Sequence, residues 1–170
     1  MDISLRPARP DEAAELSDLA MRSKRHWGGY DDAFMDACQD ALTLDPTDCD
    51  GIHLIVAEIA GEVVGFHRLA GTPPQGELAD LFVDTDSIGR GVGRALIEDA
   101  QARARRLGLF RLFIEADPHA TGFYRHIGAQ PTRATPSGSV PGRMLPTFEL
   151  TVSVDAEDGA DRADQGTGPA

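Results

Sequence analysis

The sequence predicts an α/β fold in which helices pack on a mixed (α+β type) β-sheet. Stretches rich in β-branched residues alternate along the chain with stretches whose apolar residues recur at helical spacing. The expected order of elements is β-α-α-β-β-β-α-β-α-β-β. With 170 residues, of which 41% are hydrophobic, the chain is long enough for one domain with a substantial core and leaves little room for two.

The amino-terminal part is predicted to hold one strand and two helices. The strand Ile3–Pro7 alternates in polarity and ends at its proline. A helix starts at Pro10, where two acids follow near the positive end of the helix dipole, and it ends near Trp27. A second helix is expected from Asp31 or Asp32 to Leu42.

The central part is predicted to form three strands and a helix. The first two strands, Ile52–Ile59 and Val63–Ala70, are separated by three residues and should form a hairpin. A third strand is expected at Glu77–Val83. A glycine-rich turn then leads into a helix from about Val92 to Leu107, which ends at the following glycine.

The carboxy-terminal part is predicted to contain a strand, a short helix and two final strands. The strand is expected at Phe110–Ala116, and the sequence Asp117-Pro118 starts a helix that runs through Ile127. The final strands are expected near Ala129–Ala134 and Met144–Val154. These elements complete the predicted mixed sheet.

The last residues have the composition of a disordered tail. Residues 155–170 contain five acids and one Arg and no large apolar residue. Such a segment cannot bury enough surface to offset the entropy cost of ordering it. We therefore expect a folded domain at 1–154, with a net charge of −8, and a disordered acidic tail at 155–170.

The charge balance and the apolar runs exclude several classes of protein. The chain has 16 Lys and Arg against 28 Asp and Glu, a formal net charge of −12, whereas nucleic-acid-binding proteins are normally basic. The longest apolar runs, such as Ile52–Ala60, are far shorter than the roughly 20 residues that cross a bilayer. The first residues show no secretory signal. We expect a cytoplasmic protein that binds neither nucleic acid nor a membrane.

A glycine-rich turn between the strand 77–83 and the helix 92–107 is the strongest chemical signal. Gly89, Gly91 and Gly93 let the backbone approach a phosphate, and the helix dipole adds partial positive charge. A turn that merely needs glycines is the alternative explanation. The patterns GxxxxGK[ST] and GxGxxG are both absent, which excludes the common nucleotide fingerprints.

The segment from Leu81 to Ile97 resembles the acetyl-CoA-binding motif of the GCN5-related N-acetyltransferases (GNAT). In that family a strand runs into a loop of the pattern [Q/R]-x-x-G-x-[G/A], whose amides hold the pyrophosphate of CoA. Gly91 and Gly93 occupy the glycine positions, while Ile88 stands where Gln or Arg is usual. This departure loses a side-chain contact but keeps the amides, and Arg90 is a candidate to compensate.

The resemblance implies a set of cofactor-binding residues on the strand and on the turn. They are Leu81, Phe82, Val83, Ile88, Gly89, Arg90, Gly91, Val92, Gly93 and Arg94.

A second segment, Asp117–Ala129, resembles a later motif of the same family, [D/N]-P-x-A-x-x-[F/L]-Y-x-x-x-G-[F/A]. It lies one strand and one short helix after the first motif, as the family order requires. The element order matches over about 150 residues. Two further segments, 23–30 and 136–146, are similar to bacterial family members of uncharacterised substrate. The resemblance therefore implies the GNAT acyl-CoA N-acyltransferase fold.

The reaction that the resemblance implies is transfer of the acetyl group of acetyl-CoA to a primary amine, by direct attack in a ternary complex. Tyr124 matches the usual general acid, since a phenol with a pKa of roughly 10 can donate a proton to the departing thiolate. Its alternative role is an aromatic anchor, although Phe123 beside it is expected to fill that role.

The base is less well defined than the acid. Glu77 starts the strand before the turn, in a place comparable to a catalytic Glu of the histone-acetylating branch, and it could accept the amine proton directly or through water. A solvated acid at a strand end and a water relay without a strong base are the alternatives. Asp80, three residues on, should lie on the opposite face of the strand.

The acceptor pocket is expected near the junction of the two amino-terminal helices. Because that junction usually walls the pocket in this fold, His26, Trp27 and Tyr30, together with Asp80, are the candidate substrate-binding residues. A core role for the aromatic residues is the alternative. His119 and His126 have no third ligand, so no metal site is expected.

Two functions from different classes remain open. The first is an acetyl-CoA-dependent N-acetyltransferase acting on a small amine or a peptide, and the second is a non-catalytic acyl-CoA-binding or regulatory module on the same fold. The acidic region before Gly61, with thirteen acids and five bases, favours a cationic acceptor. Because the final strands are often the dimer interface in the family, a homodimer is one expectation.

Overall fold

The structure is a computed structural model that describes residues 2–27 and 29–153. The helices are α1 (Ala13–His26), α2 (Asp32–Leu42), α3 (Val92–Arg106) and α4 (Thr121–His126), and short 3₁₀ turns lie at Pro10–Glu12 (η1), Pro46–Asp48 (η2), Thr85–Ser87 (η3) and Pro118–Ala120 (η4). The strands are β1 (Ile3–Pro7), β2 (Leu54–Ile59), β3 (Glu62–Thr72), β4 (Gln75–Val83), β5 (Arg111–Glu115), β6 (Gln130–Pro131), β7 (Thr135–Pro136), β8 (Met144–Leu145) and β9 (Thr147–Thr151). The predicted tail at 155–170 lies outside the described residues.

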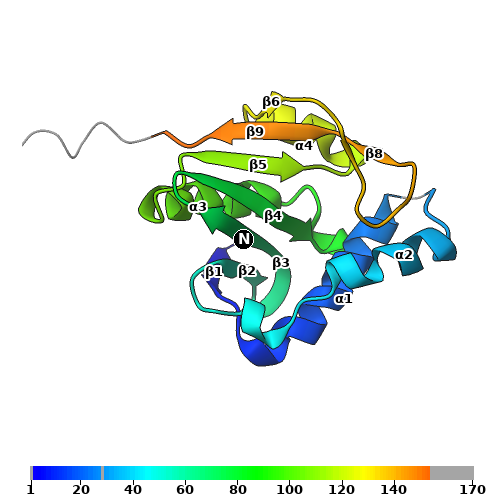
Figure 1. Ribbon diagram of the computed structural model, residues 1–170. Coiled ribbons are helices and arrows are strands. Elements are labelled where there is room, and N and C mark those ends of the chain that lie inside the picture. Colours follow the sequence, from blue (N-terminus) through cyan, green and yellow to red (C-terminus); the bar gives the residue numbers. More distant parts are fainter. Residues whose placement is uncertain (1, 28, 154–170) are drawn as a thin grey trace, which may run out of the picture.

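The strands form one mixed sheet and one small ribbon. In the described part of the chain, the sheet order is β1-β2-β3-β4-β5-β9-β6, and β7 pairs with β8 separately. Neighbouring strands are antiparallel except for β4 and β5, which are parallel and are connected through α3. The predicted fold class is confirmed, and so is the predicted element order up to α4 (Figure 1).

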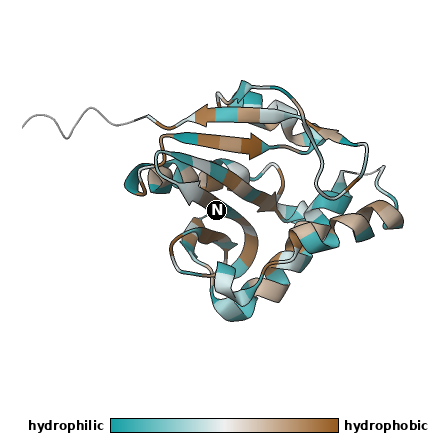
Figure 2. Ribbon diagram, viewed as in Figure 1, coloured by the Kyte–Doolittle hydropathy of each residue, from teal (hydrophilic) through white to brown (hydrophobic). Residues whose placement is uncertain are grey.

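The helices cover the two faces of the sheet separately. Leu16 and Leu19 of α1 pack with Phe66 of β3 on one face. On the other face, α3 packs on the first four strands through residues such as Leu96, and α4 packs on β5 and β9 through Tyr124. Apolar residues concentrate on the central strands, while the outer helix faces and the loops are hydrophilic (Figure 2).

Local sequence explains where several elements begin. The side chain of Asp31 accepts a hydrogen bond from the amide of Phe34 and caps α2. The side chain of Asp50 accepts from the amides of Ile52 and His53 and holds them in a turn. The strand predicted from Ile52 therefore starts only at β2, two residues later.

The prediction of two long final strands is wrong. The segment expected at 129–134 is reduced to β6, and the one expected from Met144 is divided at Pro146 into β8 and β9. Pro131, Pro136, Pro141 and Pro146 lie in this region and lack the amide hydrogen that extends a ladder. A loop that carries the β7–β8 ribbon therefore replaces a regular hairpin.

Candidate functional site

The parallel strands β4 and β5 separate soon after they pair. Their ladder joins Gln75–Glu77 to Arg111–Phe113 and goes no further, although β4 continues to Val83 and β5 to Glu115. The edge of β4 that faces β5 is therefore unpaired from Leu78 onward. An opening with free backbone groups results in the middle of the sheet.

The glycine-rich turn after β4 has a backbone suited to holding an anion, and we call it the glycine cradle. Gly89 and Gly91 have φ angles of 79° and 86°, and a Cβ added at either would meet nothing within 4 Å. Glycine is therefore needed here because the backbone is left-handed, and not because a side chain would clash, and the space above the turn is open. In the first backbone hydrogen bond of α3, the Ala95 amide donates to the Gly91 carbonyl. The amides before Ala95 therefore have no partner within the helix. Such amides favour phosphate.

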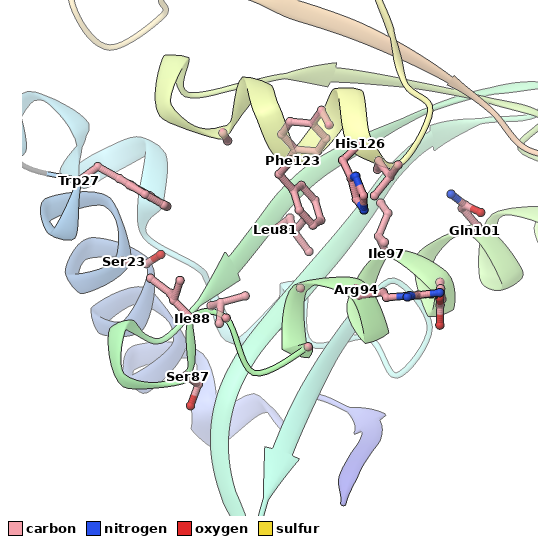
Figure 3. A pocket seen from close by; sticks show the side chains of 18 residues that line it. Ser23, Trp27, Leu81, Ser87, Ile88, Arg94, Ile97, Gln101, Phe123 and His126 are labelled. Atoms are coloured by element: carbon pink, nitrogen blue, oxygen red, sulfur yellow. Dashed lines mark hydrogen bonds and ion pairs between the residues drawn. The ribbon is translucent and has the colours of Figure 1, made fainter. Parts of the chain in front are cut away.

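A cavity of about 660 Å³ lies between this turn and α4. Its walls come from α1, β4, the turn, α3 and α4, and they include Trp27, Leu81 and Tyr124. In Figure 3, Phe123 and Leu81 lie between Trp27 on one side and His126 and Ile97 on the other. The volume falls within the range of roughly 300–1,000 Å³ that is typical of ligand pockets.

Most of the predicted cofactor-binding residues lie at this cavity. The ones that line it are Leu81, Val83, Ile88, Gly89, Gly91, Gly93 and Arg94. Phe82 instead packs against Phe66 on the other face of the sheet, because successive strand residues alternate between faces. Val92 is buried against the sheet, and Arg90 does not line the cavity. Nε of Arg94 donates to Glu98 over 2.8 Å.

Tyr124 lines the cavity and also belongs to the core. Its residue is only 6% exposed, and its ring packs on Phe123 and Phe148 at centroid distances of 5.3 Å and 5.7 Å. Burial, with the charge of Asp80 as a second cause, raises the pKa of Tyr124 well above its usual value. Phe123 packs against this core, as expected of an anchor, but Tyr124 is the more buried of the two.

Glu77 and Asp80 lie on the same face of β4, and the expectation of opposite faces is wrong. Leu78 pairs with Leu69, whereas Asp80 pairs with the adjacent Arg68, so Ala79 is an extra residue in a β-bulge. One extra residue reverses the alternation that follows it. The face that they share is the one covered by α1, because Arg68 lies two residues from Phe66 in β3.

The two acids have different surroundings. Nε of Arg68 donates to Asp80 over 2.6 Å, and Asp80 is 8% exposed, so it forms a buried ion pair rather than part of the cavity wall. Glu77 is half-buried and has no such partner among the described ion pairs. Burial, followed by the negative charges of Glu115 and Asp80, raises the pKa of Glu77. A carboxylate with a raised pKa is a better proton acceptor.

The predicted acceptor residues of the α1–α2 junction occupy different places. Trp27 lines the cavity and stacks on His119, with 6.0 Å between ring centroids and 5° between ring planes. His26 is exposed and meets the Trp27 ring edge-on at 5.4 Å. The hydroxyl of Tyr30 lies within 2.9 Å of both carboxylate oxygens of Asp117 and does not face the cavity.

The structure also brings residues to the site that sequence reasoning missed. They are Ser23, Ile97, Glu98, Gln101, Phe123 and Ile127 on the cavity wall, and Lys24, Asp117 and Arg143 beside it. The α3 residues follow Arg94 at steps of three, four and seven, which is the spacing of one helix face. That spacing could have identified them. No sequence pattern connects Asp117 with Arg143.

The described residues contain no group of three or more His, Cys, Asp or Glu that could hold a metal ion. None of the described helices is long and apolar enough to cross a bilayer.

The comparison with family models matches residues 13–129 to the family described as Acetyltransferase (GNAT). A search of curated proteins finds no match.

Solved structures resemble the chain over most of its length. A GCN5-related N-acetyltransferase from Rhodopseudomonas palustris is 25% identical with a TM-score of 0.73, over 89% of this chain and 98% of that one. The paia N-acetyltransferase from Thermoplasma acidophilum, in complex with coenzyme A, is 15% identical with a TM-score of 0.70, over 89% and 99%. The yncA protein from Salmonella typhimurium, with its cofactor acetyl-CoA, is 20% identical with a TM-score of 0.62, over 100% and 99%.

Proposed function

Because this chain belongs to the GNAT family of acetyltransferases, we propose that it transfers the acetyl group of acetyl-CoA to a primary amine by direct attack in a ternary complex. One observation carries the proposal: the glycine cradle and the Tyr124 side chain open into the same cavity, beside the gap between β4 and β5. An anion site and a proton donor are the two features that thioester aminolysis needs from the protein.

The cradle is proposed to bind the pyrophosphate of CoA. Gly89 and Gly91 leave space for close approach, and the first amides of α3 have no partner within the helix and have the helix dipole behind them. The related structures from Thermoplasma acidophilum and Salmonella typhimurium contain coenzyme A and acetyl-CoA, which supports this assignment. The unpaired edge of β4 from Leu81 to Val83 would bind the pantetheine arm through backbone groups.

Tyr124 is proposed as the general acid. The amine nitrogen attacks the thioester carbonyl, a C–N bond forms, the C–S bond breaks and the thiolate takes the phenol proton. The raised pKa of Tyr124 keeps the phenol protonated at neutral pH until that moment. Its packing against Phe148 fixes the position of the hydroxyl.

Glu77 is proposed as the proton acceptor for the amine. It lies where β4 and β5 separate, and the charge of Asp80 is among the causes that raise the pKa of both Glu77 and Tyr124. The amine would enter from the face of the sheet that carries Glu77, while the thioester arrives from the cavity. The base and the acid then act on opposite sides of the reacting carbonyl.

The test is thiol release from acetyl-CoA with a panel of amines that includes amino acids, polyamines, aminoglycosides and peptides with free amino termini. We expect at least one amine to support turnover, and Tyr124→Phe to reduce kcat about 100-fold or more. The affinity for CoA, measured by calorimetry, should stay within about threefold because the cradle is intact. Unchanged turnover in Tyr124→Phe would exclude this residue as the acid. A panel without any turnover, with CoA binding retained, would instead indicate a non-catalytic acyl-CoA-binding module.

A further inference from the structure

Asp117 binds side chains from two parts of the chain that are far from it in the sequence, residues 24–30 and Arg143. Its carboxylate accepts a hydrogen bond from the Tyr30 hydroxyl at 2.8 Å and from Nζ of Lys24 at 3.1 Å. Nη2 of Arg143 lies 3.5 Å from the same carboxylate and donates to the Tyr30 hydroxyl over 2.7 Å. The amide of His119 completes the set at 3.0 Å. Helix α1, the α1–α2 junction and the loop between β7 and β8 therefore meet at one carboxylate.

Aromatic rings hold the two cations beside Asp117. Tyr30 and Phe34 stack with 4.2 Å between centroids. The guanidinium of Arg143 lies 4.7 Å from the Phe34 ring and 5.1 Å from the Tyr30 ring, and Lys24 lies within 5.7 Å of both. Cation–π contacts of this kind are worth most where water is excluded. The loop before β8 descends from the β5–β9 side to the α1–α2 junction, where Arg143 makes these contacts (Figure 1).

The cluster is partly buried, which makes its members depend on one another. The side chains of Lys24, Asp117 and Arg143 are 14%, 16% and 17% exposed. Removing one member of a buried charge cluster leaves the others unpaired at a large cost. Although burial alone would raise it, the bonds from His119, Tyr30 and Lys24 hold the pKa of Asp117 below its usual value.

The cluster adjoins the cavity, and its Arg143 belongs to the loop that carries the β7–β8 ribbon. The Tyr30 ring meets His119 edge-on at 5.9 Å, and His119 stacks on Trp27 of the cavity wall. At its other end the same loop contacts Glu115, a group that acts on Glu77, through a 3.2 Å hydrogen bond from Thr135. Phe113 pairs with Glu77, and Glu115 follows two residues later, so this contact places the Thr135 end of the loop on the face of the sheet that carries Glu77.

Building on the proposed function, we propose that Asp117 is a positioning residue for the acetyl transfer. It holds Tyr30 and Arg143 together and thereby fixes the loop beside the path of the amine and, through His119, the Trp27 ring on the cavity wall. Asp117 touches neither substrate; it acts through these residues. The consequence is that the acceptor, and not acetyl-CoA, depends on its charge.

The chain offers a matched control for this charge. Asp45 precedes Pro46 as Asp117 precedes Pro118, and each accepts a hydrogen bond from the amide two residues on, at 2.9 Å and 3.0 Å. The described bonds of the Asp45 side chain all stay within the η2 turn. Asn in either position keeps an oxygen for the cap and loses the charge. Asp117→Asn and Asp45→Asn therefore differ in the long-range contacts alone.

The first measurement uses the amine with the highest turnover in the panel above. Asp117→Asn is expected to raise the KM for that amine at least tenfold and to leave the KM for acetyl-CoA within twofold, whereas Asp45→Asn changes neither. Tyr30→Phe, which removes one hydroxyl, should raise the amine KM by a smaller factor and serves if Asp117→Asn does not fold. Equal rises in the KM values for the amine and for acetyl-CoA would show that the whole site has loosened and would overturn the proposal. Unchanged KM values in both Asp117→Asn and Tyr30→Phe would overturn it as well.

The second measurement needs no acceptor, because Trp27 is the chain's one tryptophan. Asp117→Asn should about double the acrylamide quenching constant of its fluorescence, since the Tyr30 ring that meets His119 edge-on loses its charged partner, and Asp45→Asn should not. Quenching that is unchanged in Asp117→Asn overturns the proposal. Absence of turnover in the wild-type chain would contradict the proposed function alone, and the quenching result would still decide whether Asp117 fixes the wall.

Discussion

At the scale of single residues, the chemistry of Glu77 depends on groups that other strands bring to it. Glu115 lies on β5 and Asp80 follows the bulge on β4, and both raise the pKa of Glu77 in addition to the effect of burial, while Arg68 lowers it. A base with a raised pKa loses its activity at a higher pH than an ordinary carboxylate, because it is protonated there. The pH dependence of turnover therefore reports this environment.

We predict that kcat falls toward acid pH with a midpoint above 4.5, the ordinary value for Glu. Glu77→Gln should abolish this acid limb of the pH profile together with most of the activity. Glu115→Gln should keep the activity and move the limb toward 4.5, because a negative neighbour has been removed. The measurement is kcat against pH with both substrates saturating.

The control for this prediction is Glu149→Gln. Glu149 lies on β9, where its carboxylate is 3.4 Å from Nε of Arg111. It is not among the groups that shift the pKa of Glu77. It should leave the limb in place. A limb that stays at the same pH in Glu115→Gln would contradict the environment described for Glu77.

At the scale of elements, helix α3 is joined to the sheet by a polar clasp as well as by its apolar face. Nε2 of the fully buried His67 on β3 lies 2.8 Å from Asp99 on α3, and Nε of Arg103 donates to the same carboxylate over 2.7 Å. Burial alone would raise the pKa of Asp99, but these two bonds outweigh it and lower the pKa below 3.8. Because α3 also carries the glycine cradle at its start, the clasp helps to fix the cradle on the sheet.

We predict that Asp99→Asn lowers the free energy of unfolding by about 1–3 kcal/mol at pH 7. A carboxyl whose folded pKa is depressed stabilises the protein above its ordinary pKa and loses that effect as the pH falls through the folded value. The difference between wild type and variant should therefore shrink once the pH is below 3.8. Urea unfolding at pH 7 and at acid pH measures both values.

Glu98→Gln is the control on the same helix. Its pair with Arg94 is exposed, so the loss should be at most about 0.5 kcal/mol. An Asp99→Asn variant as stable as Glu98→Gln at pH 7 would show that the clasp contributes nothing.

At the scale of the whole molecule, the net charge of −12 is unevenly distributed. Residues 86–125, which include the cradle, carry seven Arg against five acids, whereas the region before Gly61 carries thirteen acids and five bases. An anionic co-substrate is drawn to the first region. The described contacts of the fold continue to the carboxy-terminal end of the sheet, where the amide of Val152 donates to Phe110 over 2.9 Å.

We predict that ending the chain after Val154 changes Tm by no more than about 1 °C, because the removed residues lack the apolar surface needed to pack. The shortened chain should also keep the increase in Tm that CoA produces, which amounts to about 5–10 °C when CoA is at 100 times its Kd. Differential scanning calorimetry of both chains with and without CoA measures the two effects. A loss of several degrees would show that the domain boundary lies beyond 154.

Much of the fold could be predicted because its determinants are local. The β-branched runs, the proline and acids at the start of the first helix, and the glycines around α3 each act within a few residues. The element order up to α4 follows from them. The region of Pro131–Pro146 was mispredicted because its β-branched and apolar residues suggested strands, while four prolines remove the amides that strands need.

The site was predicted only in part. The cradle is contiguous in sequence, so its glycines could be identified, and Tyr124 follows from a second contiguous motif. The bulge at Ala79, which places Glu77 and Asp80 on one face, leaves no mark in the residue types. The partners of Asp117 are 87, 93 and 26 residues away in the chain and could not be paired from the sequence.

The sequence by itself determined the fold class, the phosphate cradle and the identity of the proposed acid, because each depends on neighbouring residues whose backbone preferences and spacing are visible in one dimension. The tertiary structure alone decided that Glu77 and Asp80 share one face of β4, how the pKa values of Glu77 and Tyr124 are shifted, and which distant segments meet at Asp117. Those properties depend on distance in space and on the exclusion of water, and both arise only when strands and helices from distant parts of the chain pack together.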